Sequence, residues 1–346
     1  MLKKWTLVIS SMIVICIISC GSGKEEVPEP EPPNPPNPIV FAKGADISWI
    51  SEMEDLGIKF YNVGGTEQDI MLIMKNLGMN SIRLRVWVNP AAGYNNLADV
   101  TEKALRAKAL GLRIMIDFHY SDTWADPGHQ TKPVAWASQD INGLVASVSS
   151  HTADVMNGLK DAGIVPEWVQ VGNETNDGML WPEGKASTNM ANFTRLVNAG
   201  YDAVKQVSPT SKVIVHLSNG YDNNLYRWIF DGLKANAGKW DIIGMSLYPV
   251  PTGWATYTDQ CLTTMNDMVA RYGSPVMVVE VGMSWDQPAA CKAFLRDIIS
   301  KTKAVNGNKG LGVFYWEPES YNNFSGYTLG AFDNQGRPTI AMDAFN

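Results

Sequence analysis

Positive charge is scarce in this chain, and its scarcity excludes one large class of partner. The 28 Lys and Arg residues are outnumbered by 35 Asp and Glu residues, the net charge is −7, and no basic cluster occurs in the body of the chain. Proteins that bind nucleic acid concentrate Lys and Arg on one face. Nucleic acid is therefore not expected as a partner.

Cysteine is also scarce. The chain has four cysteines, of which Cys16 and Cys20 lie near the N-terminus, so the body holds only Cys261 and Cys291. An exported chain can form disulfides, and both body cysteines occur in helix-like stretches that are candidates for neighbours. We favour a disulfide between them over a pair of buried free thiols, although the Cα separation that a bridge requires is not given by the sequence.

The hydrophobic run near the N-terminus is short for a membrane span. Two lysines precede this run, which covers residues 5–18 and has the form of a signal peptide. It leads into Ile-Ile-Ser-Cys, which resembles the lipobox of bacterial lipoproteins, whose cysteine is lipidated and becomes the mature N-terminus. We predict a lipoprotein signal peptide at residues 1–19 and a lipidated Cys20. The alternative is an ordinary signal peptide followed by an incidental cysteine.

Residues 21–38 are rich in proline and glutamate. They hold seven of the nineteen prolines and four glutamates. Such a segment cannot bury enough apolar surface to order itself, and it favours an extended spacer. We predict a linker at residues 20–38 that separates a membrane anchor from a folded domain at residues 39–346.

From residue 41 onward, strand-like and helix-like patterns alternate. Eight strands alternating with helices within about 300 residues predict a single-domain α/β fold, a (β/α)8 TIM barrel. A doubly wound open sheet is the alternative, but no glycine-rich phosphate loop follows the first strand. The predicted strands are 41–47, 81–87, 112–119, 169–174, 212–216, 240–247, 275–280 and 310–316, and the predicted helices are 66–77, 98–110, 141–163, 189–207, 225–236, 256–272 and 287–303.

Polar and aromatic residues recur where the predicted strands end. In barrel enzymes the active site occupies this end of the strands. Strands four and seven face each other across the barrel mouth and deliver Glu174 and Glu280, and a pair of carboxyl groups is what glycoside hydrolysis requires. Each glutamate alone is as well explained as a solvated loop residue. The strand-end residues are Asp46, Arg85, His119, Glu174, His216, Tyr248, Glu280 and Trp316.

The neighbours of the two glutamates predict different roles for them. Arg85 is expected to hold a nearby carboxylate ionised, and Tyr248 to donate a hydrogen bond to the same carboxylate. An ionised Glu280 suits a nucleophile, whereas Glu174 suits an acid/base with a raised pKa. Asn173 is expected to bind the 2-hydroxyl of the sugar. The alternative interpretation of Tyr248 is a core residue whose hydroxyl lies at the rim of the barrel.

Arg83, on the same strand as Arg85, has a plainer interpretation. The alternative to a role in the site is that it simply caps a surface.

Six motifs carry a resemblance to a known family. Asp-Phe-His-Tyr-Ser-Asp-Thr-Trp-Ala-Asp-Pro-Gly-His-Gln at 117–130 is the most specific, and Gly-Asn-Glu at 172–174 by itself indicates only the clan of retaining (β/α)8 glycosidases. The others are Gly-Ala-Asp-Ile-Ser at 44–48, Ile-Arg-Leu-Arg-Val-Trp at 82–87, Gly-Met-Leu-Trp-Pro at 178–182 and Tyr-Trp-Glu-Pro at 315–318. Together they resemble glycoside hydrolase family 53, the endo-β-1,4-galactanases, from about residue 41 to the C-terminus.

This resemblance implies a retaining hydrolase of β-1,4-galactan, the side chain of pectic rhamnogalacturonan. It implies Glu174 as acid/base and Glu280 as nucleophile, and it makes tryptophans at strand ends candidates for sugar platforms, each of which is alternatively a core residue. A polymeric substrate and the predicted anchor together imply an exported, monomeric protein on the bacterial outer membrane that faces outward. The candidates for substrate binding are Asp46, Arg85, Trp87, His119, Asp122, Trp124, Asn173, His216, Tyr248 and Trp316.

No cofactor or metal is predicted. Some bacterial members of the family carry calcium in a long loop after strand seven, but here residues 281–287 form a short loop with few carboxylates. Three other functions stay open. One is a clan relative acting on mannan, xylan or cellulose, and another is a glycan-binding lipoprotein, which would be expected to have lost a catalytic carboxylate. The third is a metal-dependent hydrolase using His119, Asp122 and His129, although the first strand lacks the His-x-His usual in such barrels.

Overall fold

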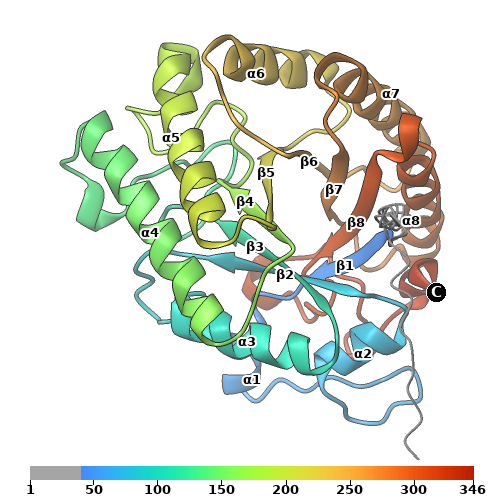
Figure 1. Cartoon of the computed structure of the whole chain (residues 1–346). Helices are drawn as coiled ribbons and strands as arrows, with labels where there is room; N and C mark the ends of the chain where they lie inside the picture. Colours follow the sequence, from blue (N-terminus) through green and yellow to red (C-terminus); the bar gives the residue numbers. More distant parts are fainter. Residues whose placement is uncertain (1–39) are drawn as a thin grey trace, which may run out of the picture. The chain divides into compact units, whose positions relative to one another are not determined.

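Eight parallel strands close into a barrel in the computed structural model, which describes residues 40–346. Each strand pairs with the next along the chain, and β1 also pairs with β8, so the sheet has no edge (Figure 1). The predicted (β/α)8 fold is confirmed. The strands are β1 (Ala42–Asp46), β2 (Ser81–Val86), β3 (Arg113–Phe118), β4 (Trp168–Val171), β5 (Lys212–Leu217), β6 (Ile242–Leu247), β7 (Val276–Val281) and β8 (Gly310–Trp316).

Helices surround the barrel (Figure 1). The second helix begins later than the sequence predicts, because Asp69 rather than Thr66 caps it by accepting a hydrogen bond from the Leu72 backbone nitrogen at 3.0 Å. A short first helix was not predicted. The α-helices are α1 (Ile50–Asp55), α2 (Ile70–Asn76), α3 (Leu97–Ala109), α4 (Ile141–Asp161), α5 (Ala186–Val207), α6 (Asn223–Ala235), α7 (Trp254–Tyr272) and α8 (Pro288–Lys303). The 3₁₀ helices are η1 (Val134–Trp136), η2 (Asn306–Asn308), η3 (Phe324–Gly326) and η4 (Ile340–Phe345).

The barrel interior changes character along its length. Toward the N-terminal ends of the strands it holds an apolar cluster that includes Met115, Ile214 and Phe314. Phe314 occupies space left free by Gly44, where an added Cβ would lie 2.2 Å from the phenyl ring. Toward the C-terminal ends the interior is polar and still fully buried. The polar layer comprises Asp46, Arg83, Arg85, Asp117, Gln170, His216 and Ser246.

Strand alternation explains how two arginines enter that layer. In β2 the side chains of Ile82 and Leu84 belong to the apolar layer under the helices. Successive side chains of a strand point to opposite faces, so Arg83 and Arg85 point into the barrel. Both are essentially inaccessible to solvent.

Cys261 and Cys291 are buried free thiols, so the favoured disulfide is wrong. The two residues lie on the neighbouring helices α7 and α8 but pack against different parts of the barrel. The Cys291 sulfur lies 3.6 Å from the Tyr315 hydroxyl on β8, whereas the Cys261 sulfur packs close to Gly220, after β5. Burial raises the pKa of Cys261 to about 12 and that of Cys291 to about 11, so both remain protonated.

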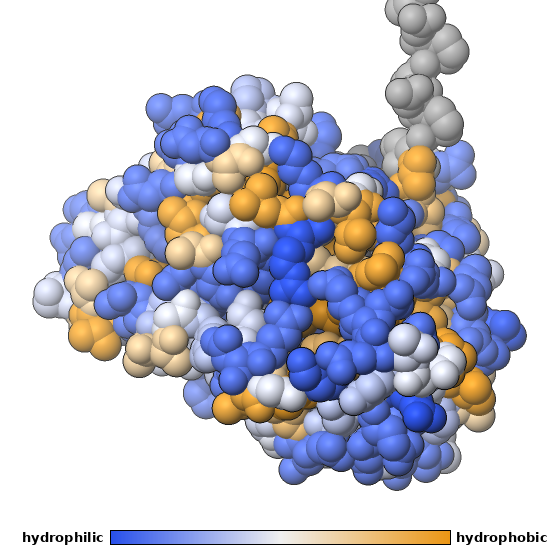
Figure 2. Space-filling view, turned by 90° about the horizontal axis from the view of Figure 1, so that it is seen from below, coloured by the Kyte–Doolittle hydropathy of each residue, from blue (hydrophilic) through white to orange (hydrophobic). Residues whose placement is uncertain are grey.

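The predicted signal peptide, the lipidated Cys20 and the spacer at residues 20–38 lie outside the described residues and stay predictions. Within residues 40–346, no helix combines the length and the apolar character needed to cross a membrane. Figure 2 views the body from the side on which α1, α2 and α3 lie. Hydrophilic residues cover most of this face, and hydrophobic residues form small separate groups on it.

Candidate active site

Glu174 and Glu280 meet in a cleft of about 300 Å³ at the C-terminal end of the barrel. Glu280 belongs to β7, and Glu174 follows β4 in a left-handed conformation with φ of +44°. Strained backbone of this kind is concentrated at functional sites. A carboxylate oxygen of each glutamate lies within 4.8 Å of the other. The cleft is lined by His119, Trp124, Ala125, Asp126, Asn173, Glu174, Tyr248, Glu280, Trp316, Tyr327 and Leu329.

This short separation distinguishes between two hydrolytic mechanisms. Retaining glycosidases place their carboxyl groups about 5–5.5 Å apart, whereas inverting enzymes need about 6.5–9.5 Å to admit a water molecule between the sugar and the base. The distance between Glu174 and Glu280 leaves no room for that water. The geometry is therefore that of a retaining pair.

Arg83 is the cation that contacts Glu280. Its Nη2 lies 2.8 Å from the Glu280 carboxylate and 2.8 Å from that of Asp117, and its Nη1 lies 2.6 Å from Asp46. Its Nε donates to Gln170 at 2.7 Å. One guanidinium group thus ties β1, β3, β4 and β7 together beneath the cleft, with every nitrogen engaged.

This arrangement corrects two predictions. Arg85 does not hold Glu280 ionised, because its own ion pair is with Glu317, at 2.7 Å. Arg83 does not cap a surface, because its side chain is fully buried. Counting from strand ends misplaced the two arginines, since strands in a barrel are tilted and staggered and the last polar residue is not always the one that reaches the centre.

The remaining contact of Glu280 is with Tyr248, whose hydroxyl donates to the second carboxylate oxygen at 2.9 Å. This is the hydrogen bond predicted from the sequence. Glu280 therefore has a cation on one oxygen and a hydrogen-bond donor on the other. Both contacts favour its ionised form.

The two glutamates share a proton near neutral pH. Burial raises the pKa of Glu174 to about 7, and a hydrogen bond from Ser246 and the charge of Arg83 lower it only in part. Burial also raises the pKa of Glu280 above the ordinary value of a carboxyl; Arg83 opposes this rise, and the neighbouring Glu174 adds to it. Two carboxylates this close titrate as one unit. Because Arg83 and Tyr248 hold the negative charge on Glu280, the shared proton lies on Glu174.

Comparison with known proteins places the chain in a family. The sequence profile of glycosyl hydrolase family 53 matches residues 42–345. The chain belongs to glycosyl hydrolase family 53. A relative from Humicola insolens, named arabinogalactan endo-beta-1,4-galactanase, is 37% identical over 302 residues, which are 81% of this chain and 90% of that protein.

Solved structures of family 53 share this fold. A fungal beta-1,4-galactanase is 34% identical with a TM-score of 0.82, over 88% of this chain and 99% of that chain. The family 53 catalytic domain from Ignisphaera aggregans is 31% identical with a TM-score of 0.81, over 90% of this chain and 97% of that chain. The match therefore extends over nearly the whole body of the chain.

In this family 53 barrel, half of the ten predicted substrate-binding residues line the cleft beside the two glutamates. The Nδ1 of His119 accepts from the Ala125 backbone nitrogen at 3.0 Å, and its Nε2 lies 3.0 Å from the Asp117 carboxylate. Asn173 donates to the Ala125 carbonyl at 2.8 Å and accepts from Arg83 at 3.0 Å. The five residues are His119, Trp124, Asn173, Tyr248 and Trp316.

Three others lie beneath the cleft. Asp46 and Arg85 are buried in ion pairs, and His216 is buried with its Nε2 2.7 Å from the Ser246 hydroxyl. Burial lowers the pKa of His216 well below its ordinary value, so this histidine is neutral. Their place is in the polar layer that supports the cleft.

The last two predicted residues lie to the side. Trp87 packs edge-to-face on Trp124, with ring centroids 5.3 Å apart. Asp122 holds two chain segments together, since its carboxylate accepts hydrogen bonds from the backbone nitrogens of Asn89 at 3.0 Å and Val134 at 2.9 Å. It is not among the residues that line the cleft.

The sequence interpretation missed Arg83 and four residues of the cleft lining, Ala125, Asp126, Tyr327 and Leu329. Arg83 could have been found from strand alternation, which places it on the same face as Arg85. Asp126, at the cleft rim, lies inside the most specific motif but was not singled out. Tyr327 and Leu329 come from the segment after β8, where no periodic pattern gives a signal.

The same geometry bears on metal binding. The triad proposed for a metal-dependent hydrolase does not assemble, because Asp122 binds backbone nitrogens and His129 binds Asp126 at 3.0 Å on the surface. Within residues 40–346, one group brings ligand atoms close together, Glu174, His216 and Glu280. Both ring nitrogens of His216 are already in hydrogen bonds, to Ser246 and Asn173. A metal ion there would have to break one of them.

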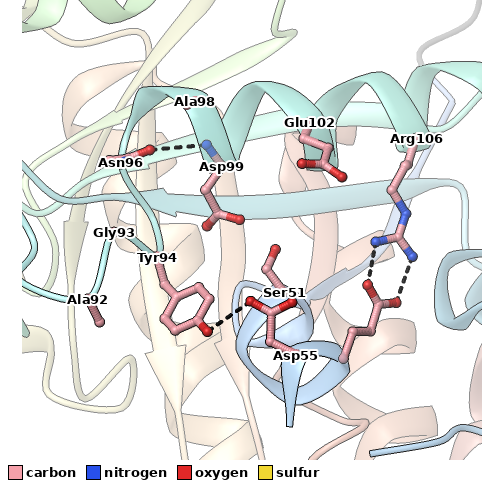
Figure 3. A pocket seen from close by; sticks show the side chains of 11 residues that line it. Ser51, Asp55, Ala92, Gly93, Tyr94, Asn96, Ala98, Asp99, Glu102 and Arg106 are labelled. Atoms are coloured by element: carbon pink, nitrogen blue, oxygen red, sulfur yellow. Dashed lines mark hydrogen bonds and ion pairs between the residues drawn. The ribbon is translucent and has the colours of Figure 1, made fainter. Parts of the chain in front are cut away.

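A larger hollow of about 410 Å³ lies outside the barrel, between α1 and α3 (Figure 3). Two of its acidic residues bind other residues of the lining. Arg106 makes a two-pronged contact with Glu54 at 2.8 Å, and the Tyr94 hydroxyl donates to Asp55 at 2.9 Å. This hollow shares no lining residue with the cleft that holds the paired glutamates.

Proposed function

We propose that this protein is an endo-β-1,4-galactanase that hydrolyses pectic (arabino)galactan with retention of anomeric configuration. One observation above all supports this function: a carboxylate oxygen of Glu174 and one of Glu280 lie within 4.8 Å of each other in the cleft. Membership of family 53 and the galactanase names of its relatives support the substrate.

The mechanism follows from the two protonation states. Glu174 donates its proton to the glycosidic oxygen while the Glu280 carboxylate attacks the anomeric carbon, and the bond to the leaving sugar breaks. A galactosyl ester on Glu280 results. Glu174, now ionised, takes a proton from a water molecule that attacks the same carbon, which releases galactan with its original β configuration.

The cleft aromatics supply the binding surface. Trp124 and Trp316 line the cleft together with Tyr327. Aromatic rings present apolar faces that complement the C–H faces of a sugar. We assign these rings to sugar binding, and Asn173 to a hydroxyl near the reacting carbon.

The test of this function is product analysis on purified protein. Pectic β-1,4-galactan should yield short galacto-oligosaccharides early, and NMR should show the β-anomer forming first. Galactose as the sole product would indicate an exo enzyme instead. Absence of products with retained binding would favour a glycan-binding protein, and products only from mannan, xylan or cellulose would move the substrate to another β-1,4-glycan.

The pH profile should reveal the shared proton. Glu174 can donate only while protonated, so kcat/KM should fall about tenfold per pH unit above about pH 7, where its pKa lies. With a substrate whose leaving group needs no proton, the rate of the first step should no longer fall at alkaline pH. An alkaline limb that persists unchanged in Glu174→Gln with such a substrate would assign the titration to another group.

The N-terminal segment is proposed to anchor the enzyme outside the cell. A signal-like run, a lipobox-like Cys20 and a spacer support export as a lipoprotein of the outer membrane, where a monomer would meet polymeric galactan. Cys20→Ala should move the protein from the membrane fraction to the soluble exported fraction in cell fractionation. Cys16→Ala, inside the predicted signal peptide, is the matched control, and membrane retention of the Cys20 variant would contradict the anchor.

A further inference from the structure

Arg85 lies under the cleft in an unusual environment. Its Cζ is 4.2 Å from the ring centroid of Trp124, 5.2 Å from that of Trp87 and 5.5 Å from that of Trp49. The side chain is 1% exposed. Within residues 40–346 its Nε and Nη2 have no hydrogen-bond partner, and only Nη1 has one, Glu317. Since two of its three nitrogens have no hydrogen-bond partner, this buried guanidinium is held largely by contacts with aromatic rings.

The rings around Arg85 continue into the cleft. Trp124 lines the cleft and touches Trp316, also in the cleft, with centroids 5.8 Å apart. Trp49 packs edge-to-face on both, at 5.7 and 5.1 Å. Arg85 therefore packs directly on Trp124 and is linked to Trp316 through Trp124 and Trp49.

A pair of buried glutamates anchors the cation. Glu317 follows Trp316 in the chain with φ of +45°, binds Arg85 at 2.7 Å and accepts from the Trp49 backbone nitrogen at 3.2 Å. Glu319 is also fully buried, and no N–H or O–H group within residues 40–346 donates to either of its carboxyl oxygens. Its polar neighbour is the carboxyl group of Glu317.

The charge of Arg85 determines which of the two carboxyl groups, Glu317 or Glu319, is protonated. When two carboxyl groups share one buried site, the pKa of one of them is strongly raised. Since Arg85 contacts Glu317, the charge lies on Glu317, and Glu319 is a neutral acid that donates its proton to Glu317. Burial and the neighbouring Glu317 raise the pKa of Glu319 well above its ordinary value, in agreement with this assignment.

We propose that Arg85 is a positioning residue, anchored by the Glu317–Glu319 carboxyl pair, that holds the indoles of Trp124 and Trp316 in the orientation that a sugar ring requires. This inference rests on the proposed function and deepens it. Arg85 touches neither Glu174 nor Glu280, whose cation is Arg83. Its loss should therefore weaken substrate binding more than it slows bond cleavage.

The test compares R85K with R113K. Arg113 is a matched control at the other end of the barrel, where its Cζ lies 4.3 Å from the Trp168 ring and its guanidinium pairs with Glu167 at 2.6 Å. R85K should raise KM for galactan about tenfold with kcat changed less than about threefold, and it should alter the near-ultraviolet circular dichroism of the tryptophans. R113K should leave KM at the wild-type value.

The glutamate pair gives a second, independent test. E319Q keeps a neutral hydrogen-bond donor and should rescue most of the affinity that E319L loses. E317Q removes the charge opposite Arg85 and should raise KM as R85K does. Folded R85K with an unchanged KM, or E319Q as damaging as E319L, would overturn the proposal.

The galactanase function and the positioning role of Arg85 can be contradicted independently of each other. Should wild-type protein leave galactan intact, the proposed function fails. The near-ultraviolet spectra of R85K, E319L and R113K, which need no substrate, still decide whether Arg85 positions the tryptophans. A spectrum of R85K identical with that of the wild type overturns the positioning role whatever the substrate is.

Discussion

The E280A variant should lose galactan hydrolysis by about 10⁴-fold or more, as expected when a covalent nucleophile is removed. Glu280 is 5% exposed, holds an ion pair with Arg83 at 2.8 Å and accepts from Tyr248 at 2.9 Å. These contacts orient its carboxylate toward the cleft and keep it ionised. Alanine leaves the pocket and the acid Glu174 in place but removes the atom that attacks the sugar. Initial rates of reducing-end release measure the effect.

Azide separates the nucleophile from the acid/base. In E280A, azide can enter the space left by the carboxylate and attack an activated aryl galactoside from that face, which yields the α-galactosyl azide. In E174A the galactosyl ester still forms on Glu280, and azide then displaces it to give the β-galactosyl azide. Products of the opposite configuration would exchange the two roles. Full activity of E280A would remove Glu280 from the mechanism altogether.

The R83M variant should destabilise the protein by about 3–5 kcal/mol, as expected when one partner of a buried ion pair is removed. Methionine has a similar length but no charge, so Asp46, Asp117 and Glu280 would remain buried without their cation. Arg83 itself is fully buried and contacts all three carboxylates within 2.8 Å. Urea unfolding at neutral pH measures the loss.

The destabilisation by R83M should depend on pH in a definite direction. In the wild type, burial raises the pKa of Asp117, but Arg83, His119 and His216 together lower it below its ordinary value. Asp117 therefore contributes stability above its unfolded pKa and loses it as the pH falls. Without Arg83, burial raises the pKa of the same carboxyl. The gap between wild type and R83M should therefore be largest at neutral pH and narrow toward pH 4.

Arg106 offers a matched control for this variant. It also pairs with two carboxylates, Glu54 at 2.8 Å and Asp69 at 2.7 Å, but its side chain is 28% exposed. R106M should lower the free energy of unfolding by less than about 1 kcal/mol, because ion pairs that are partly exposed to solvent contribute little to stability. Equal losses in R83M and R106M would show that the buried network contributes no more than a surface one.

The sequence by itself determined the fold and the two reacting groups. The alternation of apolar strand runs with helical periodicity predicted eight β/α units, since strand and helix periods follow from backbone geometry alone. Glu174 and Glu280 could be identified because both lie at C-terminal strand ends, which a parallel barrel brings to one face. The hydrogen bond of Tyr248 followed from its place on the adjacent strand.

Only the tertiary structure decided which charges meet. Arg83 and Arg85 alternate with apolar residues in the same way, and the sequence does not say which reaches Glu280 and which reaches Glu317. Strand tilt and stagger decide it, and these are properties of the closed sheet.

The cysteines and the C-terminal segment also show that the sequence does not give the contacts between distant side chains. Cys261 and Cys291 lie on neighbouring helices, yet each sulfur packs on a different part of the barrel, so adjacency of elements did not imply contact of side chains. Tyr327 and Leu329 reach the cleft from an irregular segment without any repeating pattern. Local sequence periodicity specifies elements and faces, whereas contacts between distant side chains arise only when the barrel closes and its core packs.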